Sequence, residues 1–404
     1  MSSILTNNSA MVALQTMKKI NSNMAMTQSE ISTGKSVANA KDNAAVWAIS
    51  KVMESDVKGF KGISDSLNLG SSTVAVAREA AETVTDLLTE MKGKIVAAQE
   101  GNVDRGKIQT DVAKLREQIG SVVGAAQFNG LNLVNGGGNV DILSSLDRSS
   151  SGVAASSITV TAQNLSTGAY AANDVFSAGS GAALVSGAGD TFALSLDAAT
   201  GTDTITIQDG ATAWAAGDEI TMRFGDKSAS YTVTADDLGA ASSTADLVAV
   251  GLKNAIDALG ISGLTVEYDS ANAGELALTN GGATDMAVSG QFKNANSGGL
   301  GALAAINVST ESGAELALGS IETLLQTSIN AAAAFGSSQK QIDIQSEFVG
   351  KLSDALKSGI GAMVDANMEE TSARLQALQV QQQLATQSLS MANQQPQNIL
   401  SLFR

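Results

Sequence analysis

The spacing of apolar residues predicts long helices at both ends of the chain. Between residues 71 and 98 the apolar positions recur at alternating intervals of three and four, which marks one packed face of a helix. They are Val74, Ala77, Ala81, Val84, Leu88, Met91, Ile95 and Ala98. A second stripe follows the helix-breaking stretch GNVDRG at 101–106 and comprises Ile108, Val112, Leu115, Ile119 and Val122. The two stripes together predict a helical hairpin.

The C-terminal zone repeats this pattern. One stripe comprises Leu318, Ile321, Leu325, Ser328, Ala332 and Phe335, and another comprises Val364, Met368, Thr371, Leu375, Leu378, Gln382, Ala385, Leu389 and Ala392. Near the N-terminus the stripe is thinner, because Asn, Ser and Thr dilute it, and it comprises Met17, Ile20, Met24, Thr27 and Ile31. Such a stripe does not stabilise an isolated helix. We therefore expect a partner helix from the same chain or from another copy.

The middle zone, about residues 136–307, changes to a period of two. Its alternating runs are DTITIQDG, DEITMRFGDKSASYTVTADD, LTVEYDS, ELALTNGG and DMAVSGQF. Alternation punctuated by Gly and Asp predicts β-strands and hairpins, with one short helix at about 244–259. Trp214, Phe224 and all three tyrosines lie in this zone, so we expect it to have a small core of its own.

Composition and charge separate the same zones. The chain is 44% apolar but only 3% aromatic, which suits long helices packed side by side. Residues 141–306 carry 5 Lys/Arg and 18 Asp/Glu, so most of the net charge of −16 belongs to the middle zone. Such an acidic segment is expected to face solvent, whereas the nearly neutral helical zones can pack against copies of themselves. The negative charge argues against a nucleic-acid partner.

The residue types argue against catalysis, cofactors and metals. With no Cys and no His, the chain cannot form a Ser-His-Asp triad or a His- or Cys-ligated metal site. The stretch STGKS at 32–36 ends like a phosphate-binding loop, but position 29 is Ser29 instead of the required Gly, and a predicted helix precedes it. Acidic pairs such as Asp236 and Asp237 are interpreted as solvated turn residues. A weak calcium site in the middle zone would lack an EF-hand or a Gly-Asp repeat.

Targeting signals of the usual kinds are not expected. The first twenty residues, MSSILTNNSAMVALQTMKKI, lack the basic and apolar regions of a secretory signal peptide. No run of about 18 apolar residues predicts a membrane span.

Three motifs carry a resemblance to a known family. They are EISTGKSVANAKDNAAVWAIS at 30–50, QFNGLNLV at 127–134 and ANQQPQNILSLFR at 392–404. In this order, they resemble bacterial flagellin, of the alphaproteobacterial type. The resemblance covers about residues 1–135 and 310–404 and leaves out the middle zone.

The resemblance implies a mixed fold, with a coiled-coil-like α-helical bundle built from both chain ends and a β-rich insert between them. A terminal helical pair, 1–40 and 363–404, would form the filament core around the export channel. Residues 41–140 and 308–362 would form an inner helical domain, and 141–307 a variable, surface-exposed insert.

The function implied is that of a structural, non-enzymatic subunit. It would be secreted by type III export and polymerise into the extracellular filament of the flagellum, for motility. Its partners would be other copies of itself, the export apparatus, an export chaperone, and the cap and junction proteins, with no membrane or nucleic acid. Two alternatives stay open, a hook–filament junction protein and a β-rich adhesin or enzyme whose insert binds a ligand.

The residues expected at the subunit interface lie on the terminal helices. They are Met17, Ile20, Met24, Ile31, Met368, Leu375, Leu378, Leu389, Ile399, Leu400, Leu402 and Phe403. Pro396 is the only proline in the chain, and we expect the last helix to end or bend there, ahead of an apolar tip.

The resemblance also implies an encounter with Toll-like receptor 5, the innate immune receptor for flagellin. Family members that it senses present an Arg and a Leu where this chain has Glu90 and Lys94. We expect Glu90, Lys94 and Asp111 to face the receptor and activation to be weak. Glu90 and Lys94 are four residues apart, so a local ion pair on a solvated helix face is the alternative interpretation.

Overall fold

The computed structural model describes residues 7–149, 152–179 and 181–402. The fold divides into two compact units. The terminal unit comprises Met1–Asp65, Ser145–Ser156 and Gln345–Arg404, and the central unit comprises Ser66–Ser144 and Ser157–Ile344. Two 54-residue helices, α2 (Ala44–Ala97) and α6 (Glu311–Val364), contribute to both units.

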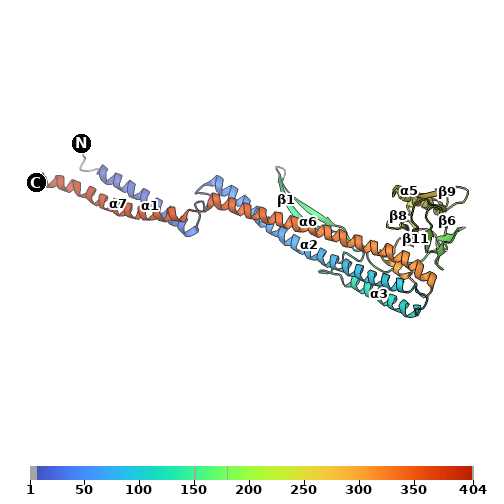
Figure 1. Cartoon of the computed structure of the whole chain (residues 1–404). Helices are drawn as coiled ribbons and strands as arrows, with labels where there is room; N and C mark the ends of the chain where they lie inside the picture. Colours follow the sequence, from blue (N-terminus) through green and yellow to red (C-terminus); the bar gives the residue numbers. More distant parts are fainter. Residues whose placement is uncertain (1–6, 150–151, 180, 403–404) are drawn as a thin grey trace. The chain divides into compact units, whose positions relative to one another are not determined.

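The terminal unit pairs the two ends of the chain. Helix α1 (Asn8–Thr33) lies beside α7 (Met368–Leu402) (Figure 1). The side chain of Asn7 caps α1 by accepting a hydrogen bond from the Ala10 N–H at 3.0 Å. Gly34 ends the helix in the left-handed region, at φ 69°, where glycine has no steric penalty. The thin N-terminal stripe therefore finds its partner helix within the same chain.

Three helices form the rod-like part of the central unit. Helix α3 (Arg105–Ala125) lies beside α2 after a turn at 98–104, as the GNVDRG break predicts (Figure 1). The predicted stripe of α2 is buried along its whole length, from Val74 to Ala98. Removing this apolar surface from water, at about 25 cal/mol per Å², is the main force that holds the helices together.

On α6 and α3 the buried stripe differs from the predicted one by single residues. Leu324 and Ala331 are buried on α6, where the sequence favoured Leu325 and Ala332. On α3 the buried residue is Val123 and Val122 is only half-buried. Where two apolar residues are adjacent, spacing alone does not say which of them faces the core.

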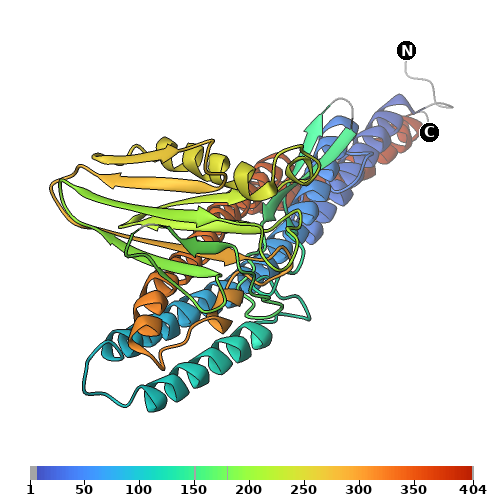
Figure 2. The same cartoon turned by 90° about the vertical axis from the view of Figure 1, so that its right-hand side faces the viewer.

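The middle of the chain is β-rich, as predicted. A hairpin of β1 (Val140–Ser149) and β2 (Gly152–Val160) comes first. A four-stranded sheet follows in the order β3 (Phe176–Ala178), β6 (Gly201–Ile207), β10 (Glu275–Asn280) and β9 (Leu264–Tyr268). A five-stranded sheet has the order β4 (Leu184–Val185), β5 (Thr191–Leu196), β11 (Met286–Lys293), β7 (Glu219–Phe224) and β8 (Lys227–Thr232). Figure 2 shows these strands in green to orange.

Short helices complete this region and close its core. They are α4 (Ala235–Leu238), α5 (Thr244–Ala258) and the 3-10 helix η1 (Gly301–Ala304), and α5 matches the helix predicted at 244–259. Alternate residues of β7 and β10 are buried, as a period of two requires. Phe176 of one sheet meets Phe192 of the other edge to face, with ring centroids 5.0 Å apart. The expected separate core of the middle zone is therefore confirmed.

The last helix does not end at its proline. The backbone of α7 continues through Pro396 to Leu402, so the expectation of a helix end at this residue is wrong. Proline removes one hydrogen bond to the preceding turn, and a 35-residue helix can continue around that single defect. Within the described ranges, no helix combines the length and the apolar character needed to cross a membrane.

Candidate subunit interface on the terminal helices

The contact between α1 and α7 is built from very few buried side chains. Ile20 of α1 packs with Leu378 and Ala385 of α7, and Met17 and Met24 cover this cluster from the side. Two polar contacts tie the helices together. The Gln382 amide donates to the Asn21 side chain at 2.9 Å, and the Asn7 amide donates to the Ala392 carbonyl at 2.8 Å.

The residues predicted for the subunit interface fall into three groups. Most are buried or half-buried in the terminal unit, and these are Met17, Ile20, Met24, Ile31, Leu375, Leu378 and Leu389. Met368, in contrast, is exposed. The side chains of Ile399, Leu400 and Leu402 and the whole of Phe403 lie outside what the structure describes.

A second apolar surface on the terminal pair was not predicted. Its exposed residues are Met11, Val12, Leu14 and Met26 on α1 and Val380, Leu384 and Met391 on α7. Val380 follows the buried Leu378 by two residues, about 200° around the helix at 3.6 residues per turn. Val380, Leu384 and Met391 are spaced by four and seven residues, so they share one face of α7, directed away from α1. This spacing was a signal in the sequence that the Gln-rich surroundings obscured.

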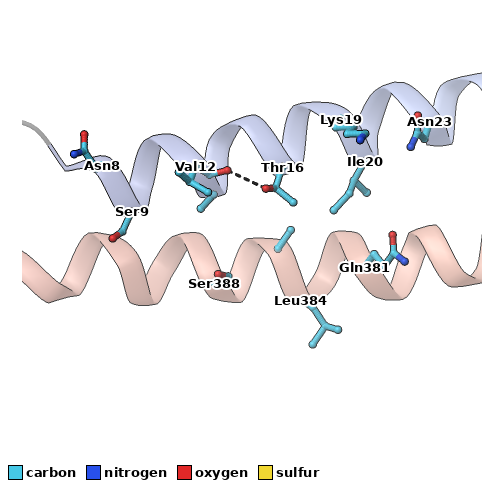
Figure 3. A pocket seen from close by; sticks show the side chains of 12 residues that line it. Asn8, Ser9, Val12, Thr16, Lys19, Ile20, Asn23, Gln381, Leu384 and Ser388 are labelled. Atoms are coloured by element: carbon cyan, nitrogen blue, oxygen red, sulfur yellow. Dashed lines mark hydrogen bonds between the residues drawn. The ribbon is translucent and has the colours of Figure 1, made fainter.

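A groove of about 830 Å³ runs between the two helices. Figure 3 shows Val12, Thr16 and Ile20 on one helix and Gln381 and Leu384 on the other. The Thr16 hydroxyl donates to the Val12 carbonyl at 2.9 Å, which satisfies this polar group within its own helix. Because the remaining wall is largely apolar, the groove offers a surface that water solvates poorly.

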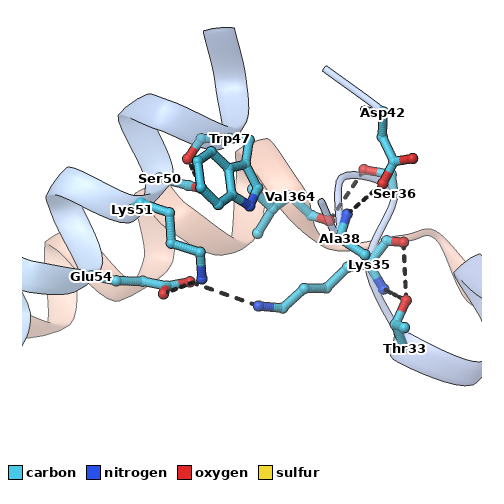
Figure 4. A network of polar contacts seen from close by, with 10 residues as sticks. All are labelled: Thr33, Lys35, Ser36, Ala38, Asp42, Trp47, Ser50, Lys51, Glu54 and Val364. Atoms are coloured by element: carbon cyan, nitrogen blue, oxygen red, sulfur yellow. Dashed lines mark hydrogen bonds and ion pairs between the residues drawn. The ribbon is translucent and has the colours of Figure 1, made fainter. Parts of the chain in front are cut away.

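The linkers that follow α1 and precede α7 are joined by their backbones (Figure 4). The Ser36 N–H donates to the Val364 carbonyl at 2.7 Å, and the Ala366 N–H donates to the Gly34 carbonyl at 2.9 Å. Beside them Glu54 pairs with Lys51 at 2.7 Å and with Lys35 at 3.7 Å. The hydrogen bond from Lys51 lowers the pKa of Glu54.

This arrangement also explains the STGKS stretch. It lies at the C-terminal end of α1, whereas a phosphate-binding loop requires a preceding strand and a following helix N-terminus. Among the described residues, no group of three or more acidic side chains is placed to hold a metal ion.

The three residues expected to face the receptor lie close together in the central unit. Glu90 and Asp111 are exposed, and Lys94 is half-buried. The Lys94 ammonium binds the Asp111 carboxylate of α3 at 2.7 Å. The ion-pair partner of Lys94 is therefore Asp111, whereas the alternative interpretation from the sequence paired Lys94 with Glu90. The hydrogen bond and charge of Asp111 raise the pKa of Lys94, and the nearby Glu90 contributes less. The turn that brings α3 back beside α2 creates this contact.

Comparisons with known proteins agree with this organisation. The family model of the bacterial flagellin N-terminal helical region matches residues 4–138, and that of the bacterial flagellin C-terminal helical region matches residues 318–403. Flagellin A of Rhizobium meliloti is 34% identical over 420 aligned positions, and Flagellin A of Rhizobium meliloti strain 1021 is 36% identical over 432. Both alignments cover 100% of this chain and of the relative. The chain belongs to the bacterial flagellin family.

As a flagellin, the protein is a structural subunit of the flagellar filament, which lies outside the cell and serves motility. The family resemblance and its alphaproteobacterial type, predicted from three motifs, are confirmed. Among solved structures, the junction protein FlgL of Legionella pneumophila is 11% identical, with 78% of this chain and 98% of that chain covered. Its TM-score of 0.36 is too low to bear on function. The full-length identity to flagellins favours the filament subunit over the junction protein.

Proposed function

We propose that this flagellin polymerises through the outward-facing apolar side chains of its terminal helix pair. The observation that carries the proposal is the second stripe of α7, Val380, Leu384 and Met391, which lies opposite the face that binds α1. A helix with apolar residues on both faces needs a partner on both sides. Among the described residues only α1 packs on α7, so a second copy of the chain fits the other face and the adjoining groove.

The same reasoning extends to the layout of the subunit. We assign residues 1–40 and 363–404 to the filament core, 41–140 and 308–362 to an inner helical layer, and 141–307 to the outer surface. The charge supports this order, because residues 141–306 hold 18 acidic and only 5 basic side chains. Mutual repulsion favours placing such inserts where solvent and salt can screen them.

The energetics fit an open polymer. Burying one Leu, Val or Met side chain contributes about 1.5–3 kcal/mol, so the exposed residues of the pair are sufficient for repeated contacts. A contact between two different surfaces of identical copies generates an open helix when the rotation from one copy to the next does not close into a ring.

Finer partners follow from membership of the family and are part of this proposal. They are the type III export apparatus, an export chaperone, and the cap and junction proteins. We also propose that the chain has no catalytic role, since it contains neither Cys nor His.

The proposal is tested by Leu384→Ser, with Leu238→Ser as the matched control. Both leucines are exposed, at 58% and 42%, but Leu238 lies on α4 in the insert. Losing about 1.5–3 kcal/mol per contact corresponds to a rise of roughly ten- to a hundredfold in the critical concentration for polymerisation. We expect this rise for Leu384→Ser alone, measured by sedimentation and electron microscopy. Normal polymerisation of Leu384→Ser would refute the assigned interface.

A further inference from the structure

We infer that the exposed methionines of the terminal helices form an oxidation-sensitive site, at which peroxides stop an unassembled subunit from joining the filament. This inference rests on the proposed assembly through α1 and α7. It adds a chemical modification that acts on that interface.

Methionine gathers on the two helices that form the proposed interface. Helices α1 and α7 carry six of the 12 methionines of the chain. Four of the six are exposed, Met11 at 55%, Met26 at 56%, Met368 at 44% and Met391 at 65%. In contrast, Met91 of the helical core and Met222 of the insert core are fully buried. The molecule therefore contains its own unreactive reference residues.

The chemistry requires no catalytic group, only access to the sulfur. The thioether sulfur attacks one oxygen of a hydroperoxide, and the O–O bond breaks. One oxygen stays on the sulfur as a sulfoxide, and the other leaves as water or an alcohol after taking up a proton. The sulfur is oxidised by two electrons and the peroxide is reduced by two. Exposure thus determines which methionines react.

The product is unsuited to a buried interface. A sulfoxide turns a flexible apolar side chain into a polar one. Burying a polar group without a hydrogen-bond partner is unfavourable, and the other exposed residues of these two helices include the apolar Val12, Leu14, Val380 and Leu384. Oxidation at Met391 places the new oxygen directly on the second stripe of α7.

The effect should be limited to free subunits and should be reversible. Once a subunit is assembled, the interface covers these side chains, and oxidant no longer reaches them. Methionine sulfoxide reductases reverse the modification, so an oxidised subunit is not lost permanently.

The experiment uses purified full-length monomer, treated with hydrogen peroxide and then allowed to polymerise. Peptide mass spectrometry should find Met11, Met26, Met368 and Met391 oxidised, while Met91 and Met222 stay intact. The critical concentration should rise by about tenfold or more, and treatment with sulfoxide reductase should restore it. Preformed filaments, treated in the same way, should show little oxidation at the four exposed positions.

Leucine replacements separate this inference from its premise. The quadruple variant Met11→Leu, Met26→Leu, Met368→Leu and Met391→Leu keeps apolar side chains of similar volume and should polymerise equally well with and without peroxide. If the quadruple variant does not polymerise before treatment, the double variant Met11→Leu, Met391→Leu is used instead. Its critical concentration should rise less on oxidation than that of the unmodified chain. Normal polymerisation of the oxidised unmodified chain overturns the inference. If Leu384→Ser still weakens assembly in that case, the interface stands and only the methionine site is wrong.

Discussion

At the scale of single residues, the insert pairs every tyrosine of the chain with an aspartate. The Tyr231 hydroxyl donates to Asp237 at 2.9 Å, and Tyr170 and Tyr268 donate to Asp190 and Asp246. Burial first, and then the charge of Asp190, raise the pKa of Tyr170. Asp190 is itself buried and also accepts from the Ser186 hydroxyl at 2.6 Å. A phenolate at Tyr170 would lie beside this buried carboxylate, where water screens the repulsion only weakly.

This pairing predicts that the insert loses stability in alkali. A pKa that is higher in the folded than in the unfolded state contributes stability that is complete below the unfolded value of about 10 and is lost as the pH rises above it. Tyr170→Phe should therefore show a shallower loss of stability above about pH 10 than the unmodified chain. The measurement is denaturant unfolding followed by the fluorescence of Trp214, in a Trp47→Phe background. Tyr268→Phe is the control and should have a smaller effect, because the hydrogen bond to Asp246, and not burial, is the main cause that raises the pKa of Tyr268.

The residues expected to face the receptor provide a second prediction at this scale. Glu90 and Lys94 replace the Arg and Leu that the resemblance associates with receptor activation, and Asp111 holds Lys94 in an ion pair. We predict weak activation of Toll-like receptor 5 by purified monomer in a reporter assay. The double change Glu90→Arg, Lys94→Leu should recover part of this activation. Removing one partner of a buried charge pair at an interface costs about 2–5 kcal/mol of binding free energy, and a reversed charge such as Glu90 should cost at least as much. Strong activation by the unmodified chain would falsify this prediction.

At the scale of elements, the sequence predicted strands and helix breaks well and outer faces poorly. The run ELALTNGG contains β10, and LTVEYDS contains β9, because alternation and turn residues are local signals. Which of the adjacent residues Leu324 and Leu325 is buried depends on the position of the neighbouring helix, because both residues are apolar. The outer stripe of α7 was not predicted, because Gln and Ser residues separate its members. The predicted stripe, which includes Leu375, Leu378 and Leu389, is the one that faces α1. Local sequence rules also did not predict that α7 continues through Pro396, because they treat proline as a residue that ends a helix.

Two glycines of α2 predict opposite effects of the same substitution. A methyl group at Gly93 would meet nothing within 4 Å, so Gly93→Ala should stabilise the helix by about 0.5–1 kcal/mol. A methyl group at Gly70 would lie 2.4 Å from the Ile142 side chain of β1, so Gly70→Ala should overpack the hairpin contact and destabilise by about 1–3 kcal/mol. Thermal unfolding followed by circular dichroism measures both. Equal shifts in one direction would contradict the packing of β1 on α2.

At the scale of the whole molecule, the insert enters and leaves the helical part at one place. The Gly298 N–H donates to the Gly168 carbonyl at 3.0 Å, and the Leu300 N–H donates to the Ser166 carbonyl at 3.1 Å. The strands between these points have their own core, which includes Phe176, Phe192 and Trp214. The two ends of the insert are therefore close enough to be joined directly once the insert is removed.

This geometry predicts that the insert can be deleted without loss of assembly. Joining Gly168 to Gly298 removes 16 Asp/Glu and 4 Lys/Arg, which leaves a net charge of −4 in place of −16. Filaments should still form, because α1 and α7 are unchanged, and their formation should depend less on salt, because less like charge needs screening. Sedimentation and electron microscopy at low and high ionic strength measure both effects. A deletion variant that keeps its helical circular dichroism but forms no filaments would show that the insert itself takes part in the contacts between subunits, and the assignment of assembly to the terminal helices alone would be wrong.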